Sequence, residues 1–250
     1  MKVEDVSDTK LNESETIERH NRVLSTISHD LKSPMVAILG FSNFLMKDMA
    51  TQPHDPRWME MLKRVVSAGQ GMQELIDDIL SMVKMEAGSE QVQPEWVADL
   101  GHELGDTVKT FEYEAKAKGI GLSIAIVSAL PPVRWDIRRI RYHVLNNIIS
   151  NALKFTPSGG SVELSAETAA NAVRIRISDT GPGIPLNEQQ RIFCRFEQGD
   201  MKSERVFKGA GLGLYNANLF VTQHGGGISV ESSTGEGTTF LIELPLDAAL

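Results

Sequence analysis

The chain has 250 residues, of which 41% are hydrophobic and 23% charged, proportions typical of a folded globular protein and not of a disordered one. Its 33 acidic residues outnumber its 25 basic ones, and the net charge of -8 argues against general nucleic-acid binding, which requires a basic face. The single cysteine, Cys194, excludes an internal disulfide and a cysteine-rich metal site, and it fits a cytoplasmic setting. The polar N-terminus and the lack of an apolar run of about 18 residues predict neither a signal peptide nor a membrane span. Membrane contact is therefore expected only through a region upstream of this chain.

A helical hairpin is predicted for residues 15–88. In its first helix apolar residues recur every seven positions, as in the seam of a bundle: Ile17, Leu24, Leu31, Ile38 and Leu45. Pro53 and Pro56 mark a loop, and a second helix with a wide apolar stripe is expected from Arg57 to Glu86. Two helices with stripes this broad cannot bury them against each other alone, which predicts a homodimer with a four-helix bundle. A monomeric hairpin packed on the second half of the chain is the alternative.

The spacing of hydrophobic residues changes after residues 89–95, a polar segment that is interpreted as a linker. Residues 1–14 form a polar N-terminal segment. Beyond the linker, helices are expected at 96–119, 136–155 and 212–222. Strands are expected at 121–127, near Val133, and at 161–167, 172–178, 228–232 and 238–244. This order of helices and mostly antiparallel strands predicts that residues 96–250 form an α+β two-layer sandwich with the helices on one face.

His29 is the first candidate for chemistry. With Leu24 and Leu31 on the seam of the first helix, His29 falls at an outward position of the heptad. Asp30 lies beside it, and a neighbouring carboxylate can accept the imidazole proton when the ring attacks an electrophile. A lone surface histidine is more often without function, so the assignment depends on the second half of the chain.

The predicted helix at 136–155 carries a polar stripe. Asn147 and Asn151 are four residues apart, and Lys154 follows three residues later, so all three lie on one face. Amides aligned with a lysine can hold a hydrated Mg²⁺ ion and the phosphates around it. Asparagines at such positions also cap or bridge neighbouring loops, and spacing alone does not decide between the two interpretations.

Three glycine clusters, at 179–184, 209–214 and 235–239, lie close to predicted strand or helix ends. Glycine permits close backbone approach, and amides at the start of a helix favour phosphate. Each cluster alone is more often an ordinary turn. Neither the Gly-x-Gly-x-x-Gly pattern of dinucleotide-binding folds nor the Walker A pattern occurs, so any nucleotide site must be of another kind.

Taken in order, these motifs resemble those of the catalytic core of two-component sensor histidine kinases. Residues 28–34 resemble the H box of that family, residues 147–157 its N box, and residues 179–184 its G1 box. Residues 191–196 resemble the F box, and residues 209–214 and 235–239 resemble the remaining glycine boxes. The resemblance implies a dimerisation and histidine phosphotransfer hairpin followed by an ATP-binding domain of the Bergerat type.

An activity follows from the resemblance. The chain is expected to be an ATP-dependent protein-histidine kinase that autophosphorylates His29, with Asp30 as general base, and passes the phosphoryl group to an aspartate of a response regulator. Ser33 stands where many members carry Thr or Asn for phosphatase activity. A cytoplasmic location, as the cytosolic part of a larger sensor, is expected. The alternative is a degenerate pseudokinase that acts as a conformational signalling or binding module.

The resemblance also implies a site for ATP and Mg²⁺. Asn151 would coordinate the metal with support from Asn147, Lys154 would face phosphate, and Asp179 would accept a hydrogen bond from the adenine amino group. The residues expected to bind ATP are Asn147, Asn151, Lys154, Asp179, Gly181, Gly183, Ile184, Phe196, Gly209, Gly211, Leu212, Gly213 and Thr238. His143 stands where the family often has Gln or Glu, and no catalytic role is assigned to it.

Overall fold

The structure is a computed structural model that describes residues 31, 34–45, 47, 57–86, 92–127, 129–195, 197 and 211–248. Within 57–86 it describes the whole backbone and part of the side chains. The chain divides into two compact units, and among the described residues the first ends at Leu80 and the second begins at Ser81.

The first unit is helical in all its described residues. Residues 34–45 are helical, and α2 runs from Arg57 to Glu86, as the apolar stripe predicts. Leu45 and Ala68 are buried, and the guanidinium of Arg64 lies 5.6 Å from the centre of the Phe41 ring. The first half of the expected seam and the loop with the two prolines lie outside the described residues.

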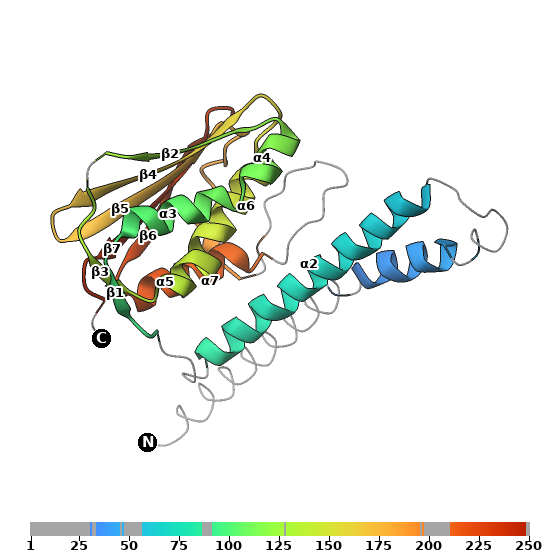
Figure 1. The fold of residues 1–250 in the computed structure, drawn as a ribbon, viewed down its shortest axis with the longest axis horizontal. Coiled ribbons are helices and arrows are strands. Elements are labelled where there is room, and N and C mark those ends of the chain that lie inside the picture. The colour runs from blue at the N-terminus through green and yellow to red at the C-terminus, as the bar shows by residue number, and fades with distance from the viewer. Residues whose placement is uncertain are drawn as a thin grey trace, which may run out of the picture. The chain divides into compact units, whose positions relative to one another are not determined.

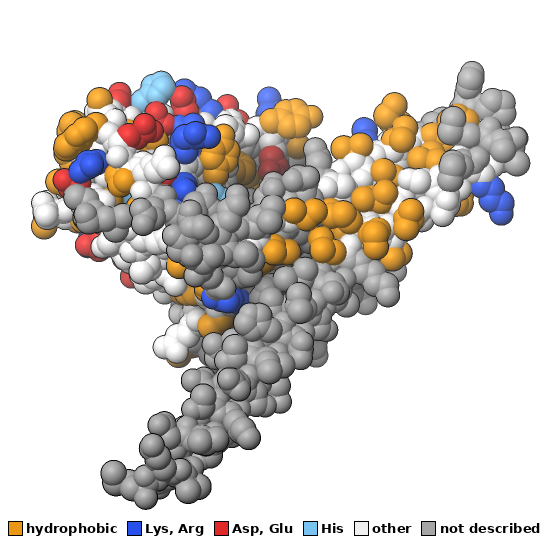
Figure 2. Space-filling model, turned by 90° about the horizontal axis from the view of Figure 1, so that it is seen from below, with side chains coloured by type: hydrophobic (Ala, Val, Ile, Leu, Met, Phe, Trp, Pro, Cys, Tyr) orange, Lys and Arg blue, Asp and Glu red, His pale blue; other side chains and the backbone are white. Residues whose placement is uncertain are grey.

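Apolar side chains remain exposed along this unit: Met35, Val36, Leu39, Phe44, Met59, Leu62, Val66 and Ile76. Figure 2 shows hydrophobic side chains gathered along this unit. Because a stable monomer seldom leaves so large an apolar set in water, the dimeric bundle stays the prediction that explains them.

The second unit is built on a five-stranded mixed sheet with the order β2-β4-β5-β7-β6 (Figure 1). The strands are β2 (Gly121–Ile126), β4 (Ser161–Ala169), β5 (Ala172–Asp179), β6 (Gly227–Ser233) and β7 (Gly237–Pro245). Within this sheet the pairing of β2 with β4 is parallel, and the other three pairings are antiparallel. The strands that the alternating pattern predicts are therefore present, and the β4–β5 hairpin turns at the expected place, Ala170-Asn171.

Helices cover one face of this sheet (Figure 1). They are α3 (Leu100–Lys109), α4 (Glu112–Lys118), α5 (Ile137–Arg139), a π-helix (Ile140–Leu145), α6 (Asn146–Phe155) and α7 (Gly213–Gln223). The core lies between the two layers, where alternate residues of β4, β5 and β7 meet the apolar faces of α3, α6 and α7. Fully buried examples are Leu104, Leu153, Ile175, Phe220 and Ile242. The predicted α+β sandwich is confirmed.

Two features of this unit differ from the prediction. The helix expected at 96–119 starts late, because Trp96 pairs with Arg134 between β1 (Glu95–Val97) and β3 (Val133–Trp135), and it is divided into α3 and α4. The carboxylate of Asp99 then caps α3 by accepting from the His102 amide at 2.9 Å. The break between α3 and α4 contains neither proline nor glycine, so composition does not mark it. The helix expected at 136–155 is continuous, but its middle turn is π-helical.

Candidate functional site

The polar stripe of α6 lies where its spacing predicts. Ile148, Ile149, Ala152 and Leu153 are buried in the core, and Asn147, Asn151 and Lys154 are half-buried on the other side of the helix. Burial lowers the pKa of the Lys154 ammonium group, and the charge of Lys118 lowers it further. This lysine therefore lacks a compensating anion among the described groups that set its pKa, and a phosphate would supply one.

Asp179 ends β5 and turns its carboxylate toward the following glycine turn. Oδ1 accepts the backbone amide of Gly181 at 2.8 Å, and Asp179 pairs with Thr238 in the register of β5 and β7. Burial raises the pKa of Asp179, while the backbone amides of Gly181 and Thr238 oppose that rise. The structure thus holds a half-buried carboxylate by backbone donors, with acceptor capacity left for the amino group of a ligand.

Two of the glycine clusters form one structural element. Gly183 has φ +74°, and a Cβ there would collide with the backbone of Ser233. Gly237 has φ +92°, and a Cβ there would collide with the carbonyl of Asp179. The turn after β5 and the β6–β7 hairpin therefore touch through their backbones, which only glycine allows.

Side-chain hydrogen bonds join the same two segments. The hydroxyl of Ser232 accepts the Ile184 amide at 2.8 Å and donates to the Gly237 carbonyl at 2.7 Å. The side-chain amide of Gln189 donates to the carbonyls of Ile184, at 2.9 Å, and Ser232, at 2.8 Å. Ser232 and Gln189 are not among the predicted site residues. No local pattern reveals them, because Ser232 is 48 residues from Ile184 and 43 residues from Gln189.

The two groups of predicted site residues meet near the end of α6. A Cβ on Gly181 would lie 3.4 Å from the carbonyl oxygen of Phe155, the residue after Lys154. At the other end of α6, Asn147 contacts Gly213, the first residue of α7. The structure thus brings together most of the predicted residues that it describes: Asn147, Asn151, Lys154, Asp179, Gly181, Gly183, Ile184, Leu212, Gly213 and Thr238.

Gly211, with φ +68°, immediately precedes buried Leu212 at the start of α7. The other predicted site residues lie outside the described part of the chain: His29, Asp30, Ser33, Phe196 and Gly209.

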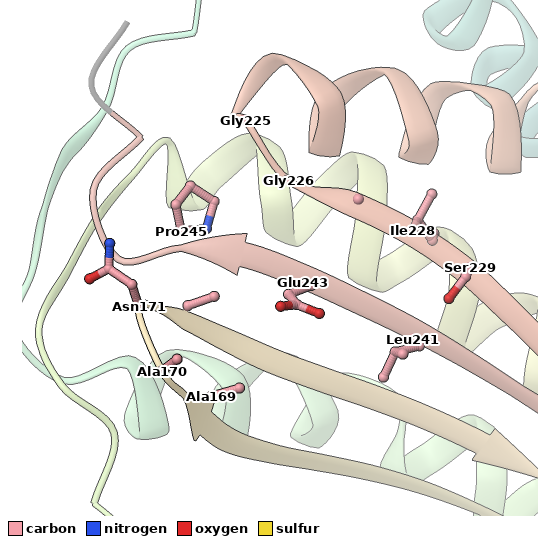
Figure 3. A pocket seen from close by; sticks show the side chains of 12 residues that line it. Ala169, Ala170, Asn171, Gly225, Gly226, Ile228, Ser229, Leu241, Glu243 and Pro245 are labelled. Carbon is pink, nitrogen blue, oxygen red and sulfur yellow. The ribbon is translucent and has the colours of Figure 1, made fainter.

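A hollow of about 550 Å³ lies at the other end of β5 (Figure 3). It is lined by the β4–β5 turn at Ala170 and Asn171, by Gly225–Gly227 and by residues of β6 and β7 such as Glu243. None of the predicted site residues lines it, so it is separate from the candidate site.

The asparagine side chains of the candidate site carry amide oxygens, which are ligands that a divalent ion takes. Across the described ranges, no cluster of three or more His, Cys, Asp or Glu side chains is placed to hold a metal. Mg²⁺ keeps most of its water ligands and binds through few protein oxygens, so the amide oxygen of Asn151 beside a bound polyphosphate fits it.

Among the described residues, no helix is both long and apolar enough to cross a bilayer.

Two family models match the chain. Residues 19–88 match the His Kinase A (phospho-acceptor) domain, and residues 135–248 match the histidine kinase-, DNA gyrase B-, and HSP90-like ATPase family. The circadian input-output histidine kinase CikA of Synechococcus elongatus is 35% identical over 226 residues, which cover 89% of this chain and 29% of that protein. The histidine protein kinase DivJ of Caulobacter vibrioides is 32% identical over 228 residues, which cover 90% of this chain and 37% of DivJ. The chain belongs to the histidine kinases.

Solved histidine kinase structures share its fold. Full-length ShkA in complex with AMPPNP has a TM-score of 0.67 and 30% identity, covering 90% of this chain and 46% of that one. The histidine kinase ThkA in complex with the response regulator protein TrrA has a TM-score of 0.69 and 20% identity, covering 99% of this chain and 69% of ThkA, a likeness of fold alone. This histidine kinase chain spans less than half the length of the relatives CikA and DivJ, and its second unit is of the ATPase type.

Proposed function

We propose that the chain is an ATP-dependent protein-histidine kinase that phosphorylates His29 and then transfers the phosphoryl group to an aspartate of a response regulator. One observation carries the proposal: the backbone-held carboxylate of Asp179 lies beside the end of the Asn147–Asn151–Lys154 stripe in a domain of the ATPase family. An ATP site needs an acceptor for the adenine amino group and a polar, cationic surface for the phosphates, and the Asp179 carboxylate and the stripe provide these.

The proposed site binds ATP from two sides. Asp179, with Gly181, Gly183, Ile184 and Thr238, would hold the adenine, because the carboxylate accepts from its amino group. Lys154 would hold phosphate, and Asn151 would place its amide oxygen on Mg²⁺, which neutralises charge on the phosphates when bound. The remaining members of the proposed site come from the F box and the second glycine cluster: Phe196, Gly209, Gly211, Leu212 and Gly213.

The proposed phosphoryl transfer uses residues of the phosphoacceptor domain, 15–88, which a linker at 89–95 joins to the ATP-binding domain, 96–250. A ring nitrogen of His29 attacks the γ-phosphorus, the bond to the bridging oxygen of ADP breaks, and Asp30 takes the imidazole proton. Little covalent work is left to the protein, so positioning and charge neutralisation supply most of the rate. Ser33 is the proposed residue for phosphatase activity.

The proposed partners are a second copy of the chain and a response regulator, in the cytoplasm. The exposed apolar side chains of the helical unit support a homodimer, because pairing two hairpins would bury them. The solved complex of ThkA with TrrA shows a regulator bound to a protein of the same fold. Sedimentation of the chain beside its Leu62→Glu variant tests the dimer, with a shift toward monomer expected in the variant.

The kinase proposal is tested by incubating the chain with γ-labelled ATP and Mg²⁺, beside its His29→Gln variant. We expect label that survives base, is lost in acid and is absent from the variant. ATP binding without label in either protein would instead support the pseudokinase. Release of free phosphate that the variant does not change would indicate an ATPase that uses water as its nucleophile.

A further inference from the structure

The side-chain nitrogen of Asn147 lies between two backbone carbonyls. Nδ2 donates to the carbonyl of His143 at 2.8 Å and to that of Gly213 at 3.2 Å. Carbonyl oxygens only accept hydrogen bonds, so the nitrogen and not the oxygen of the carboxamide must face them. An NH₂ group has two hydrogens, and this arrangement uses both. Asn147 therefore connects its own helix to the first turn of α7, 66 residues away in the sequence.

The contact between Asn147 and Gly213 is close. A Cβ at position 213 would lie 3.2 Å from both Cγ and Oδ1 of Asn147, so any side chain there would press on the carboxamide. The lack of a side chain at Gly213 allows the start of α7 to approach near enough for its carbonyl to accept the hydrogen bond.

A second contact holds α7 further along the same interface. The ring of His143 stacks on that of Phe220, with centroids 4.3 Å apart and planes 15° from parallel. The guanidinium of Arg139 lies 5.7 Å from the centre of the same Phe220 ring. The helix that runs from α5 into α6 thus meets α7 through Arg139, His143 and Asn147, which follow one another at intervals of four residues.

The π-helix explains why these three side chains stay in line. Between Ile140 and Leu145 the helix makes bonds of the i to i−5 kind, as in the bond from the Asn146 amide to the Arg141 carbonyl. In an α-helix, residues four apart pass slightly beyond one full turn, and a π-helical turn, which has more residues per turn, offsets that rotation and keeps the three side chains on one side. π-Helical turns are rare and often occur at functional sites, which agrees with the position of this one directly before the α6 stripe.

We propose that Asn147 is a positioning residue: its carboxamide nitrogen clamps the first turn of α7 to the helix that carries Asn147 and so holds Gly211–Gly213 in place for the phosphates of ATP. The amides of a first helical turn lack partners inside the helix and are donors for phosphate, so their position decides how well phosphate binds. The identity of the ligand rests on the proposed function, whereas the clamp itself rests on the two hydrogen bonds.

The clamp makes a prediction opposite to that of a metal-ligand role. In Asn147→Asp the carboxylate cannot donate, and it faces two carbonyl oxygens, so this variant should bind ATP more weakly than Asn147→Ala. If Asn147 served through its oxygen as a ligand of Mg²⁺, the aspartate would be the better ligand and Asn147→Asp would keep its affinity.

The experiment measures calorimetric binding of ATP and of adenosine to the full chain, both with Mg²⁺ and with a chelator. The clamp predicts that ATP affinity falls about tenfold in Asn147→Ala and further in Asn147→Asp, with and without Mg²⁺, while adenosine binding changes less than twofold. Asn218→Ala, the same change at a half-buried position of α7, is the control and should bind as the wild type does. Wild-type affinity in Asn147→Asp, with a Mg²⁺-dependent loss in Asn147→Ala, would overturn the proposal.

A second measurement needs no nucleotide. Hydrogen exchange at the amides of residues 216–218 reports opening of the first turn of α7, where the Asn216 amide donates to the Leu212 carbonyl at 2.8 Å. Exchange there should be faster in both Asn147 variants, with β4 and β5 unchanged. Unchanged exchange in both variants would refute the clamp, whether or not the chain binds ATP. A wild type that binds no ATP would refute the proposed function, and exchange would still decide the clamp.

Discussion

The α-carbon of Gly183 lies against the carbonyl of Ser233, so the turn that follows β5 and the end of β6 meet without a side chain between them. This contact holds the loop after Asp179 at a set distance from the β6–β7 hairpin. The carboxylate that we assign to adenine therefore depends on a glycine four residues further on.

Gly183→Ala should unfold the turn and weaken nucleotide binding. Its positive φ costs a non-glycine residue about 1–3 kcal/mol, and the collision with Ser233 adds to that cost. Gly235→Ala is a matched control in the neighbouring hairpin, because Gly235 has φ +89° but no atom within 4 Å of the place that a Cβ would occupy. Urea denaturation should show a larger loss of stability for Gly183→Ala. Equal losses would mean that the close approach contributes nothing.

Asp179→Asn should keep the fold and lose ATP affinity. The amide oxygen of asparagine can still accept from Gly181, but the charged acceptor for adenine is gone, which predicts a loss of about 10- to 100-fold. Because burial raises the pKa of Asp179, the charged form is disfavoured in the folded protein, and the variant should melt at the same or a higher temperature near neutral pH. Asp106→Asn, at a half-buried position of α3, should leave ATP binding unchanged. Calorimetric titration and thermal melting check both effects, and full affinity in Asp179→Asn would contradict the assignment.

Lys154 should take up protons when ATP binds. Its pKa is lowered in the free protein, and a nearby phosphate would raise it again, so binding should be accompanied by proton uptake in buffer whose pH lies between the lowered pKa and the ordinary value of 10.5. Calorimetry in buffers of different ionisation enthalpy measures the uptake. It should vanish in Lys154→Met, which should also bind ATP more weakly. In Lys118→Met the proton uptake should be smaller, because the pKa of Lys154 is then lowered less in the free protein. Uptake that persists in Lys154→Met would assign it to another group.

His224 should make the second unit less stable in acid. Its side chain is buried, Nε2 accepts the Asp136 amide at 3.1 Å, and Nδ1 lies 2.7 Å from the Phe220 carbonyl. Burial lowers the pKa of His224 below the ordinary value of 6.5; Phe220 and Asp136 raise it and Arg139 lowers it. The folded state therefore binds fewer protons than the unfolded state. Stability should be full above pH 6.5 and fall as the pH drops toward the lowered pKa.

The His224→Gln variant isolates this effect, since its amide oxygen can accept from Asp136 but does not titrate. Melting temperatures measured from neutral to mildly acidic pH should fall less steeply in the variant than in the wild type. Parallel curves would show that other groups cause the acid sensitivity.

Local patterns in the sequence were sufficient to predict α2, the strands of the sheet and the polar side of α6. The apolar stripe predicts α2 at its observed limits, and alternation predicts the strands of the sheet, because burial of one face imposes its period on the residues. The same reasoning places Asn147, Asn151 and Lys154 on one side of α6. The six motifs also suffice to indicate the histidine kinase family, which the two family models show.

Local patterns do not predict the contacts that join distant segments of the chain. The sequence predicts a helix at Trp96, but this residue lies in a strand because Arg134 is opposite it, and no neighbour in the sequence indicates that pairing. The π-helical turn, the bridge from Ser232 to Ile184 and the hydrogen bond from Asn147 to Gly213 likewise depend on tertiary packing. Residue type and spacing thus determined which side chains share a face. Only the folded sheet and its helices decided which of these faces meet, because backbone atoms from distant segments must first be brought within hydrogen-bonding distance.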